Sequence, residues 1–185
     1  MSAKPRRPPT RTVPASSLVL RAPLLSRLPW LVHGFSTRVG GVSSLPDSRT
    51  TGGELNLGNV DWDQPSKVAE NRRRLLECLQ AKQMTLIVQN QIHSDLIRVL
   101  TQAPVPSRSL RGDGLMTDQP GLLLGILAAD CLPVLLTDVR QRVVAALHCG
   151  WHGTVRRIAQ KAAGRMRQQF GSRPQDLRAA IGPGL

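Results

Sequence analysis

Residues 121–147 read GLLLGILAADCLPVLLTDVRQRVVAAL and contain three apolar runs separated by polar residues. The runs cover Gly121–Leu127, Pro133–Thr137 and Val143–Leu147. Each has the length of a single strand, and an uninterrupted apolar run is typical of a strand that is buried on both faces. The sequence therefore predicts three buried strands in this part of the chain.

Helical and extended patterns flank the three runs on both sides. Apolar residues at helical spacing predict helices, whereas short apolar stretches between turn-forming residues predict strands. Because helices and strands do not alternate regularly, an α+β fold is favoured over a repeated βαβ fold. The expected helices cover Ser66–Gln80 and the segment from Thr154 to Gly171, and the expected strands cover Leu86–Val88, Leu96–Leu100, Leu177–Ile181 and two extended segments within Leu18–Arg38.

The composition excludes several classes of protein. The chain has 185 residues, 41% of them hydrophobic, and only three cysteines. It is too apolar to be disordered throughout, too poor in cysteine for a disulfide scaffold, and without an apolar run that could span a membrane. Met1–Ser17 is rich in Pro and Arg and predicts a disordered basic tail before one domain over residues 18–185. With reduced thiols as the default, we expect a cytoplasmic protein.

The net charge of +13 first points to nucleic acid. However, the chain has no Tyr and only two Phe, so the aromatic residues on which bases stack are scarce. Seven of the cations precede Asp47, and many of these lie on the expected tail. We therefore predict no specific nucleic-acid partner and no membrane partner.

Three side chains able to bind a soft metal lie beside the apolar strands: His93, Cys131 and His148. One thiolate and two imidazoles make a three-ligand zinc site with an open position for water. The same residues also suit a hydrolase in which His148 activates Cys131 as a nucleophile. A buried structural cysteine with two hydrogen-bonded histidines is the third interpretation, and residue types and spacing leave all three open.

Two further positions suggest anion binding. Arg38 could hold an anion through its guanidinium fork, although a solvated arginine is the simpler interpretation. His152 lies in a glycine-flanked turn before a helix, whose N-terminal amides could hold phosphate. A plain tight turn explains that segment equally well.

Taken together and in order, several short strings resemble the YfiH-like, laccase-domain family of purine nucleoside phosphorylases, formerly called multicopper polyphenol oxidases. The resemblance covers roughly Leu18–Leu185. The strings are His33–Arg38, Gly40–Ser43, Leu55–Gly58, Val68–Arg72, Gln91–Ser94, Asp113–Asp118, Ala129–Val134, His148–Trp151 and Ile181–Pro183.

This resemblance implies a layered α+β fold of the cysteine-hydrolase-like kind. It also implies that His93, Cys131 and His148 bind zinc and act in catalysis, and that Arg38, Asn56 and His152 contact substrate or phosphate. The implied activities are phosphorolysis of adenosine, inosine and methylthioadenosine, and deamination of adenosine. Copper-dependent phenol oxidation is implied only as a secondary activity, because four histidines cannot hold several copper ions.

The sequence departs from the family pattern in three places. Cys149 and His152 replace the Ala and Arg of the usual His-Ala-Gly-Trp-Arg-Gly, and a neutral imidazole is a poorer anion ligand than a guanidinium. Ser48–Gly53 adds residues to a loop that is usually short. The family continues beyond Ile181–Pro183, so we expect a C-terminally truncated domain. A Cys/His hydrolase, or an inactive form that acts only as a binding module, are the alternatives.

Overall fold

The computed structural model describes residues 18–45, 53–101 and 110–184, which belong to two compact units. Of these described residues, the first unit contains Leu18–Leu20 and those within Ser36–Cys78, and the second contains Arg21–Phe35 and those from Leu79 onward. The expected tail over Met1–Ser17 lies outside the described residues, as does most of the loop Ser48–Gly53. Within the described ranges, no helix is long and apolar enough to cross a membrane.

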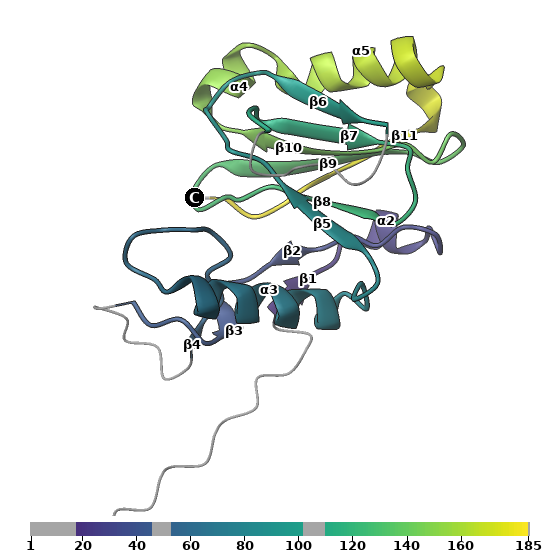
Figure 1. The fold of residues 1–185 in the computed structure, drawn as a ribbon. Coiled ribbons are helices and arrows are strands. Elements are labelled where there is room, and N and C mark those ends of the chain that lie inside the picture. Colours follow the sequence, from purple (N-terminus) through teal and green to yellow (C-terminus); the bar gives the residue numbers. More distant parts are fainter. Residues whose placement is uncertain (1–17, 46–52, 102–109, 185) are drawn as a thin grey trace, which may run out of the picture. The chain divides into compact units, whose positions relative to one another are not determined.

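The second unit is built on a five-stranded sheet with the order β11-β9-β10-β7-β6 (Figure 1). Neighbouring strands are antiparallel except β6 and β7, which are parallel. The strands are β6 (Ile97–Leu100), β7 (Gly114–Thr117), β9 (Leu132–Asp138), β10 (Val144–Cys149) and β11 (Leu177–Ile181). Four of them match predicted strands, and β7 was not predicted.

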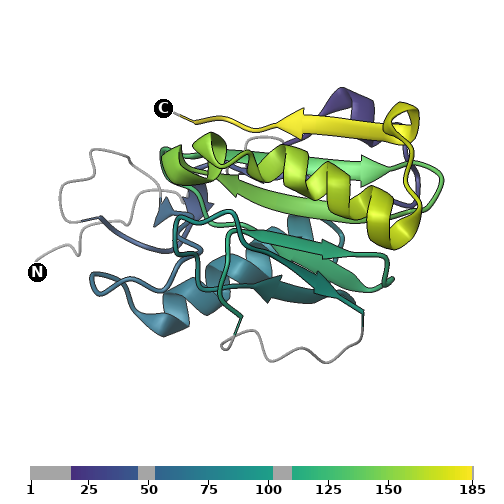
Figure 2. The same ribbon diagram turned by 90° about the horizontal axis from the view of Figure 1, so that it is seen from above.

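Helix α5 (Ile158–Phe170) covers one face of this sheet (Figures 1 and 2). Its buried residues Ile158, Ala162 and Met166 recur at helical spacing and join one apolar cluster with side chains of β7, β9 and β10. A helix with one apolar stripe must bury that stripe, and each large buried side chain stabilises the fold by roughly 1.5–3 kcal/mol. This packing holds β10 against the helix.

A two-stranded parallel sheet of β5 (Thr85–Val88) and β8 (Leu122–Gly125) packs against the same central strands. Leu115 joins a cluster with Ile87 and Leu122, whereas its neighbour Met116 joins the helix-side cluster. Successive side chains of a strand point to opposite faces, so β7 is buried on both faces and connects the two layers. The layered α+β fold expected from the sequence is confirmed.

The helix expected after Thr154 is divided into α4 (Trp151–Val155) and α5. Arg157 separates them because its φ of 60° lies in the left-handed region, which interrupts the helical path. Gly171 ends α5 with a φ of 68°, a conformation that glycine adopts without steric cost. The predicted helix end is thus confirmed, and its start lies three residues earlier than expected.

The segment from Arg21 to Phe35 contains a short helix, α2 (Pro23–Ser26), where extended structure was predicted. Pro23 occupies the first turn of this helix, a position where the missing amide hydrogen costs nothing. The buried His33 accepts a hydrogen bond at Nε2 from the Ala22 amide at 3.1 Å. Strand β2 (Phe35–Ser36) contributes one residue to each unit, and a 3-10 turn (Pro174–Asp176) precedes β11.

The first unit is organised around helix α3 (Pro65–Cys78) and the fully buried Asn71. The Asn71 amide donates to Ser43 Oγ at 2.8 Å and to the Asn56 carbonyl at 2.9 Å, and its oxygen accepts from the Val42 amide at 2.8 Å. A buried amide needs such partners to offset its loss of water. The elements of this unit are β1 (Val19–Leu20), β3 (Val39–Gly41), β4 (Gly53–Glu54) and α3 (Pro65–Cys78).

Candidate metal centre

The fold of the second unit brings His93, Cys131 and His148 together. Their ligand atoms all lie within 4.8 Å of one another. The two imidazole rings meet edge to face, with centroids 4.9 Å apart and an interplanar angle of 79°. His148 is buried, Cys131 is half-buried and His93 is exposed. The group of three therefore extends from the protein interior to the solvent.

Each of the three side chains comes from a different segment. His93 lies in the loop between β5 and β6, and Cys131 immediately precedes β9. His148 lies within β10, not after the strand as the sequence had suggested. In the antiparallel pair of β9 and β10, Leu132 is opposite Cys149, which brings Cys131 to the end of β10.

Asp113 connects two of these segments and is fully buried. Its Oδ1 lies 2.8 Å from His148 Nδ1. The same carboxylate accepts hydrogen bonds from the backbone amides of Ile92, His93 and Ser94 at 3.3, 3.0 and 2.6 Å, and from Ser94 Oγ at 2.7 Å. These bonds hold His93 in its left-handed conformation, with a φ of 54°.

The charge of Asp113 determines which ring nitrogen of His148 is available to bind a metal ion. Burial alone would raise the pKa of Asp113, but hydrogen bonds from His148 and Ser94 outweigh it and hold the pKa below its ordinary value. An ionised carboxylate only accepts hydrogen bonds, so Nδ1 of His148 is the donor, and Nε2 is the ring nitrogen left for a metal ion. In the sequence, Asp113 stood out only as the first residue of the string Asp113–Asp118. Its position directly before a short apolar segment was the one signal that could have suggested a role at the site.

The donor set and the space beside it fit a metal ion. Burial and the neighbouring Asp130 raise the pKa of the Cys131 thiol, whereas a bound cation would stabilise the thiolate. A Cβ on Gly150 would lie 3.1 Å from Cys131 Sγ, 3.3 Å from His93 Cδ2 and 3.4 Å from His148 Cε1. The glycine therefore leaves free the space that all three ligands border.

Substituting Gly150→Ala tests this space. The φ of Gly150 is −72°, which alanine adopts without strain, so the effect should be steric and local. We expect a metal affinity lower by about tenfold or more, comparable to the loss of a residue that orients a ligand, with an unchanged circular dichroism spectrum. Competition with a chromophoric chelator measures the affinity.

Gly164→Ala is the matched control for this prediction. Gly164 lies on α5, and no heavy atom lies within 4 Å of the added Cβ position. This variant should bind metal as the wild type does and gain up to about 1 kcal/mol of stability from the better helix former. An unchanged metal affinity in the Gly150 variant would contradict the assigned role of the glycine.

The other predicted site residues are distributed over both units. Arg38 belongs to the first unit, with its Nε 3.0 Å from Glu54 Oε2 and its side chain 69% exposed. Asn56 also belongs to the first unit, and its side chain accepts from the Gly58 amide at 3.0 Å and donates to Asp63 at 2.7 Å. These two bonds orient the Asn56 side chain. His152 is exposed on α4, in the second unit.

Cys149, one of the departures from the motif of the resembled family, does not belong to the triad. It packs against the helix-side cluster, and burial raises the pKa of its thiol. Because side chains alternate along a strand, Cys149 and His148 point to opposite faces of β10. The substitution therefore changes the core and adds no fourth ligand.

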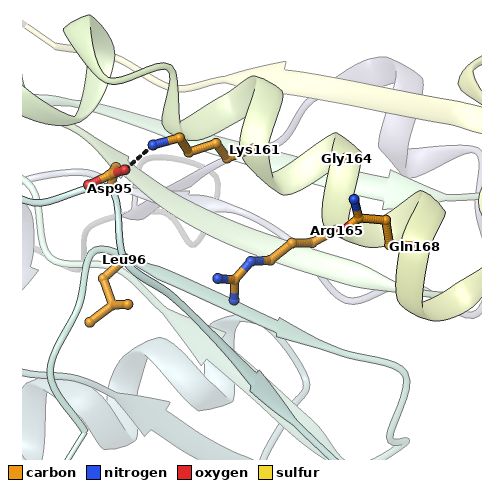
Figure 3. A pocket seen from close by; sticks show the side chains of 6 residues that line it. All are labelled: Asp95, Leu96, Lys161, Gly164, Arg165 and Gln168. Atoms are coloured by element: carbon orange, nitrogen blue, oxygen red, sulfur yellow. Dashed lines mark hydrogen bonds and ion pairs between the residues drawn. The ribbon is translucent and has the colours of Figure 1, made fainter.

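A cavity of about 430 Å³ lies beneath α5, and it includes none of the three metal-binding candidates (Figure 3). Lys161 on α5 forms an ion pair with Asp95, and Arg165 donates to the Ile97 carbonyl at 2.8 Å. The ion pair attaches the loop that carries His93 to α5, and the bond from Arg165 attaches the start of β6 to the same helix. The lining residues are Asp95, Leu96, Lys161, Gly164, Arg165 and Gln168.

Comparison with known proteins identifies the family to which this fold belongs. The model of the family described as multi-copper polyphenol oxidoreductase laccase matches residues 32–185, and the chain belongs to this family. It is 42% identical over 167 residues to a purine nucleoside phosphorylase of Deinococcus radiodurans, covering 90% of this chain and 60% of that protein. It is 37% identical over 149 residues to one of Corynebacterium glutamicum, covering 80% and 58%.

Solved structures show the same fold. YlmD from Geobacillus stearothermophilus has a TM-score of 0.72 and 26% identity, covering 97% of this chain and 64% of that one. The YfiH protein of Bacillus licheniformis has a TM-score of 0.70 and 32% identity, covering 82% and 58%. The chain thus spans less than two thirds of the length of these proteins.

Proposed function

We propose that the chain carries the metal centre of a zinc-dependent purine nucleoside phosphorylase that also deaminates adenosine. The observation that carries the proposal is the convergence of His93, Cys131 and His148, with His148 oriented by the buried Asp113. The names of the relatives support phosphorolysis as the reaction. Adenosine, inosine and methylthioadenosine are the proposed nucleosides.

Zinc is preferred to copper because of the number of ligands. Among the residues that the structure describes, a single group of three or more His, Cys, Asp or Glu side chains is arranged to hold a metal. A multicopper oxidase needs several such groups, whereas catalytic zinc uses three protein ligands. Elemental analysis of purified protein distinguishes the two ions, and copper in place of zinc would favour the oxidase.

The protein's own residues have separate roles in this proposal. Zinc, when bound, supplies Lewis-acid polarisation and activation of water at neutral pH. Cys131 provides the negative ligand, and His93 and His148 provide neutral nitrogen ligands. Asp113 keeps the proton of His148 on Nδ1 and holds the loop of His93 in place.

Phosphorolysis forms a bond between a phosphate oxygen and ribose C1′ while the bond from C1′ to the purine nitrogen breaks. The products are the free base and ribose 1-phosphate for adenosine and inosine, and the free base and methylthioribose 1-phosphate for methylthioadenosine. Arg38 is the proposed phosphate ligand because Glu54 fixes one side of its exposed guanidinium. His152 replaces an arginine of the family pattern, so we expect a higher KM for phosphate than in relatives that keep the arginine.

Chromatography of adenosine incubated with the protein, with and without phosphate, tests the proposed function. Adenine and ribose 1-phosphate should appear only when phosphate is present. Inosine should appear in both reactions, because deamination uses water and releases ammonia.

Each failure of this experiment has its own meaning. Inosine alone would leave only the deaminase, and an absence of all products would contradict the proposed function. Full activity after complete removal of the metal by a chelator would favour the alternative in which Cys131 acts as a nucleophile.

A further inference from the structure

Ser94 bonds to the Asp113 carboxylate through both its backbone and its side chain. Its amide nitrogen lies 2.6 Å from Asp113 Oδ2, and its hydroxyl oxygen lies 2.7 Å from the same atom. The hydroxyl oxygen also accepts a hydrogen bond from the Leu96 amide at 3.2 Å. The proposed function gives the Ser94 hydroxyl no task, although it contacts the residue that orients His148.

The chemistry of its two partners fixes the direction of each bond that the Ser94 hydroxyl makes. A serine hydroxyl has one hydrogen to donate and can rotate it toward either partner. The ionised carboxylate of Asp113 can only accept a hydrogen bond, and the backbone amide of Leu96 can only donate one. The hydroxyl hydrogen of Ser94 is therefore directed at Asp113 Oδ2, and the Leu96 amide holds it in that rotation.

The two oxygens of the Asp113 carboxylate have different partners. Oδ2 accepts from the Ile92 amide at 3.3 Å, and its two shorter bonds both come from Ser94. Oδ1 accepts from the His93 amide at 3.0 Å and lies 2.8 Å from His148 Nδ1. Because a carboxylate is planar, the bonds that hold Oδ2 also determine where Oδ1 lies. Ser94 thus controls the oxygen that contacts the buried imidazole.

We propose that Ser94 is a positioning residue of the metal centre, and that its hydroxyl holds the Asp113 carboxylate so that Oδ1 orients His148 for metal binding. This inference rests on the metal centre of the proposed function and not on the reaction that the centre performs. Outer partners of metal ligands set the orientation of those ligands, and their loss costs about 10–100-fold in metal affinity. Ser94 acts through Asp113, so we expect an effect at the lower end of this range.

Zinc affinity, measured by competition with a chromophoric chelator, tests the proposal. Ser94→Ala removes the hydroxyl and should bind zinc about tenfold more weakly than the wild type. Ser94→Thr keeps a hydroxyl that can donate to Asp113 and accept from Leu96, so it should restore most of the affinity.

Cobalt(II) in place of zinc gives a readout that a loss of stability alone would not change. The visible absorption of cobalt depends on the type and arrangement of its ligand atoms. At saturating cobalt, Ser94→Ala should therefore have a shifted visible spectrum, because the ring of His148 is no longer held in the same orientation. Ser94→Thr should have the spectrum of the wild type.

Ser172→Ala is the matched control. Ser172 is also a serine of the second unit, is 2% exposed, and lies just beyond the C-terminal end of α5, where its amide donates to the Met166 carbonyl at 3.3 Å. Removing its hydroxyl should leave both the zinc affinity and the cobalt spectrum of the wild type unchanged.

Unchanged zinc affinity in Ser94→Ala, an equal loss in Ser172→Ala, or no recovery in Ser94→Thr would each overturn the proposal. A weaker affinity with an unchanged cobalt spectrum would also overturn it, because the hydroxyl would then stabilise the loop without orienting a ligand. Wild-type protein that binds neither ion would overturn the metal centre together with this role. If zinc affinity depends on Ser94 but no nucleoside is phosphorolysed, the proposed function fails and the positioning role stands.

Discussion

Cys131→Ala is expected to yield protein without bound metal and with kcat/KM for phosphorolysis lowered by roughly a thousandfold. Cys131 is the only anionic ligand of the triad, and its Sγ lies within 4.8 Å of the ligand atoms of both histidines. Loss of a residue that only orients a ligand costs 10–100-fold, so loss of a ligand itself should cost more. Elemental analysis of the purified protein and initial rates with inosine and phosphate measure the two effects.

Cys149→Ala is the control that the chain itself provides. Cys149 is also half-buried and belongs to the adjacent strand, but it packs against the helix-side cluster. Its alanine variant should retain the metal and most of the activity, with some loss of stability from the smaller core residue. Equal metal content in the variants of Cys131 and Cys149 would contradict the proposed ligand set.

Asp113→Ala is expected to have the largest effect on stability, lowering the free energy of unfolding by about 3–5 kcal/mol. The substitution leaves three backbone amides and the Ser94 hydroxyl without their acceptor. It also removes the hydrogen-bond partner of the buried His148. Urea unfolding followed by circular dichroism measures the loss.

Asp113→Asn separates the two roles of this residue. Asparagine keeps the volume and one acceptor oxygen, so the loss of stability should be smaller than in the alanine variant. A neutral amide no longer stabilises the proton on His148 Nδ1, and we expect metal affinity to fall about 10–100-fold.

Asp118→Asn provides the control, because Asp118 is exposed directly after β7. Its effect on stability should stay within about 0.5 kcal/mol. A stability loss in Asp113→Ala no larger than in Asp118→Asn would refute the connecting role of Asp113.

The main strands and helices of the second unit were predictable because their apolar patterns lie within short stretches of sequence. The apolar runs became β8, β9 and β10, and Leu177–Ile181 became β11. Strand β7 was missed because Gly114–Thr117 is short and contains no β-branched residue except Thr117. It is a strand because β6 and β10 pair with it on both edges. Such tertiary pairing overrides weak propensity.

The candidate ligands could also be selected from the sequence, since four histidines and three cysteines leave few combinations. The hydrogen bonds of Asn56 to Gly58 and Asp63 could not be predicted, because they are set by the surrounding loop. Arg38, Asn56 and His152 keep their predicted substrate- or phosphate-binding roles as proposals.

The sequence by itself determines which segments form strands and helices, and which side chains have the chemistry to bind a metal. That His93, Cys131 and His148 meet, that Asp113 orients one of them, and that Cys149 faces away all depend on the tertiary structure. The physical reason is that the tendency to form a helix or a strand depends on residues that are close together in the sequence, and the metal-binding chemistry of a side chain depends on its own type. Convergence depends instead on strand register and on side-chain alternation, which are set by hydrogen bonds between distant segments.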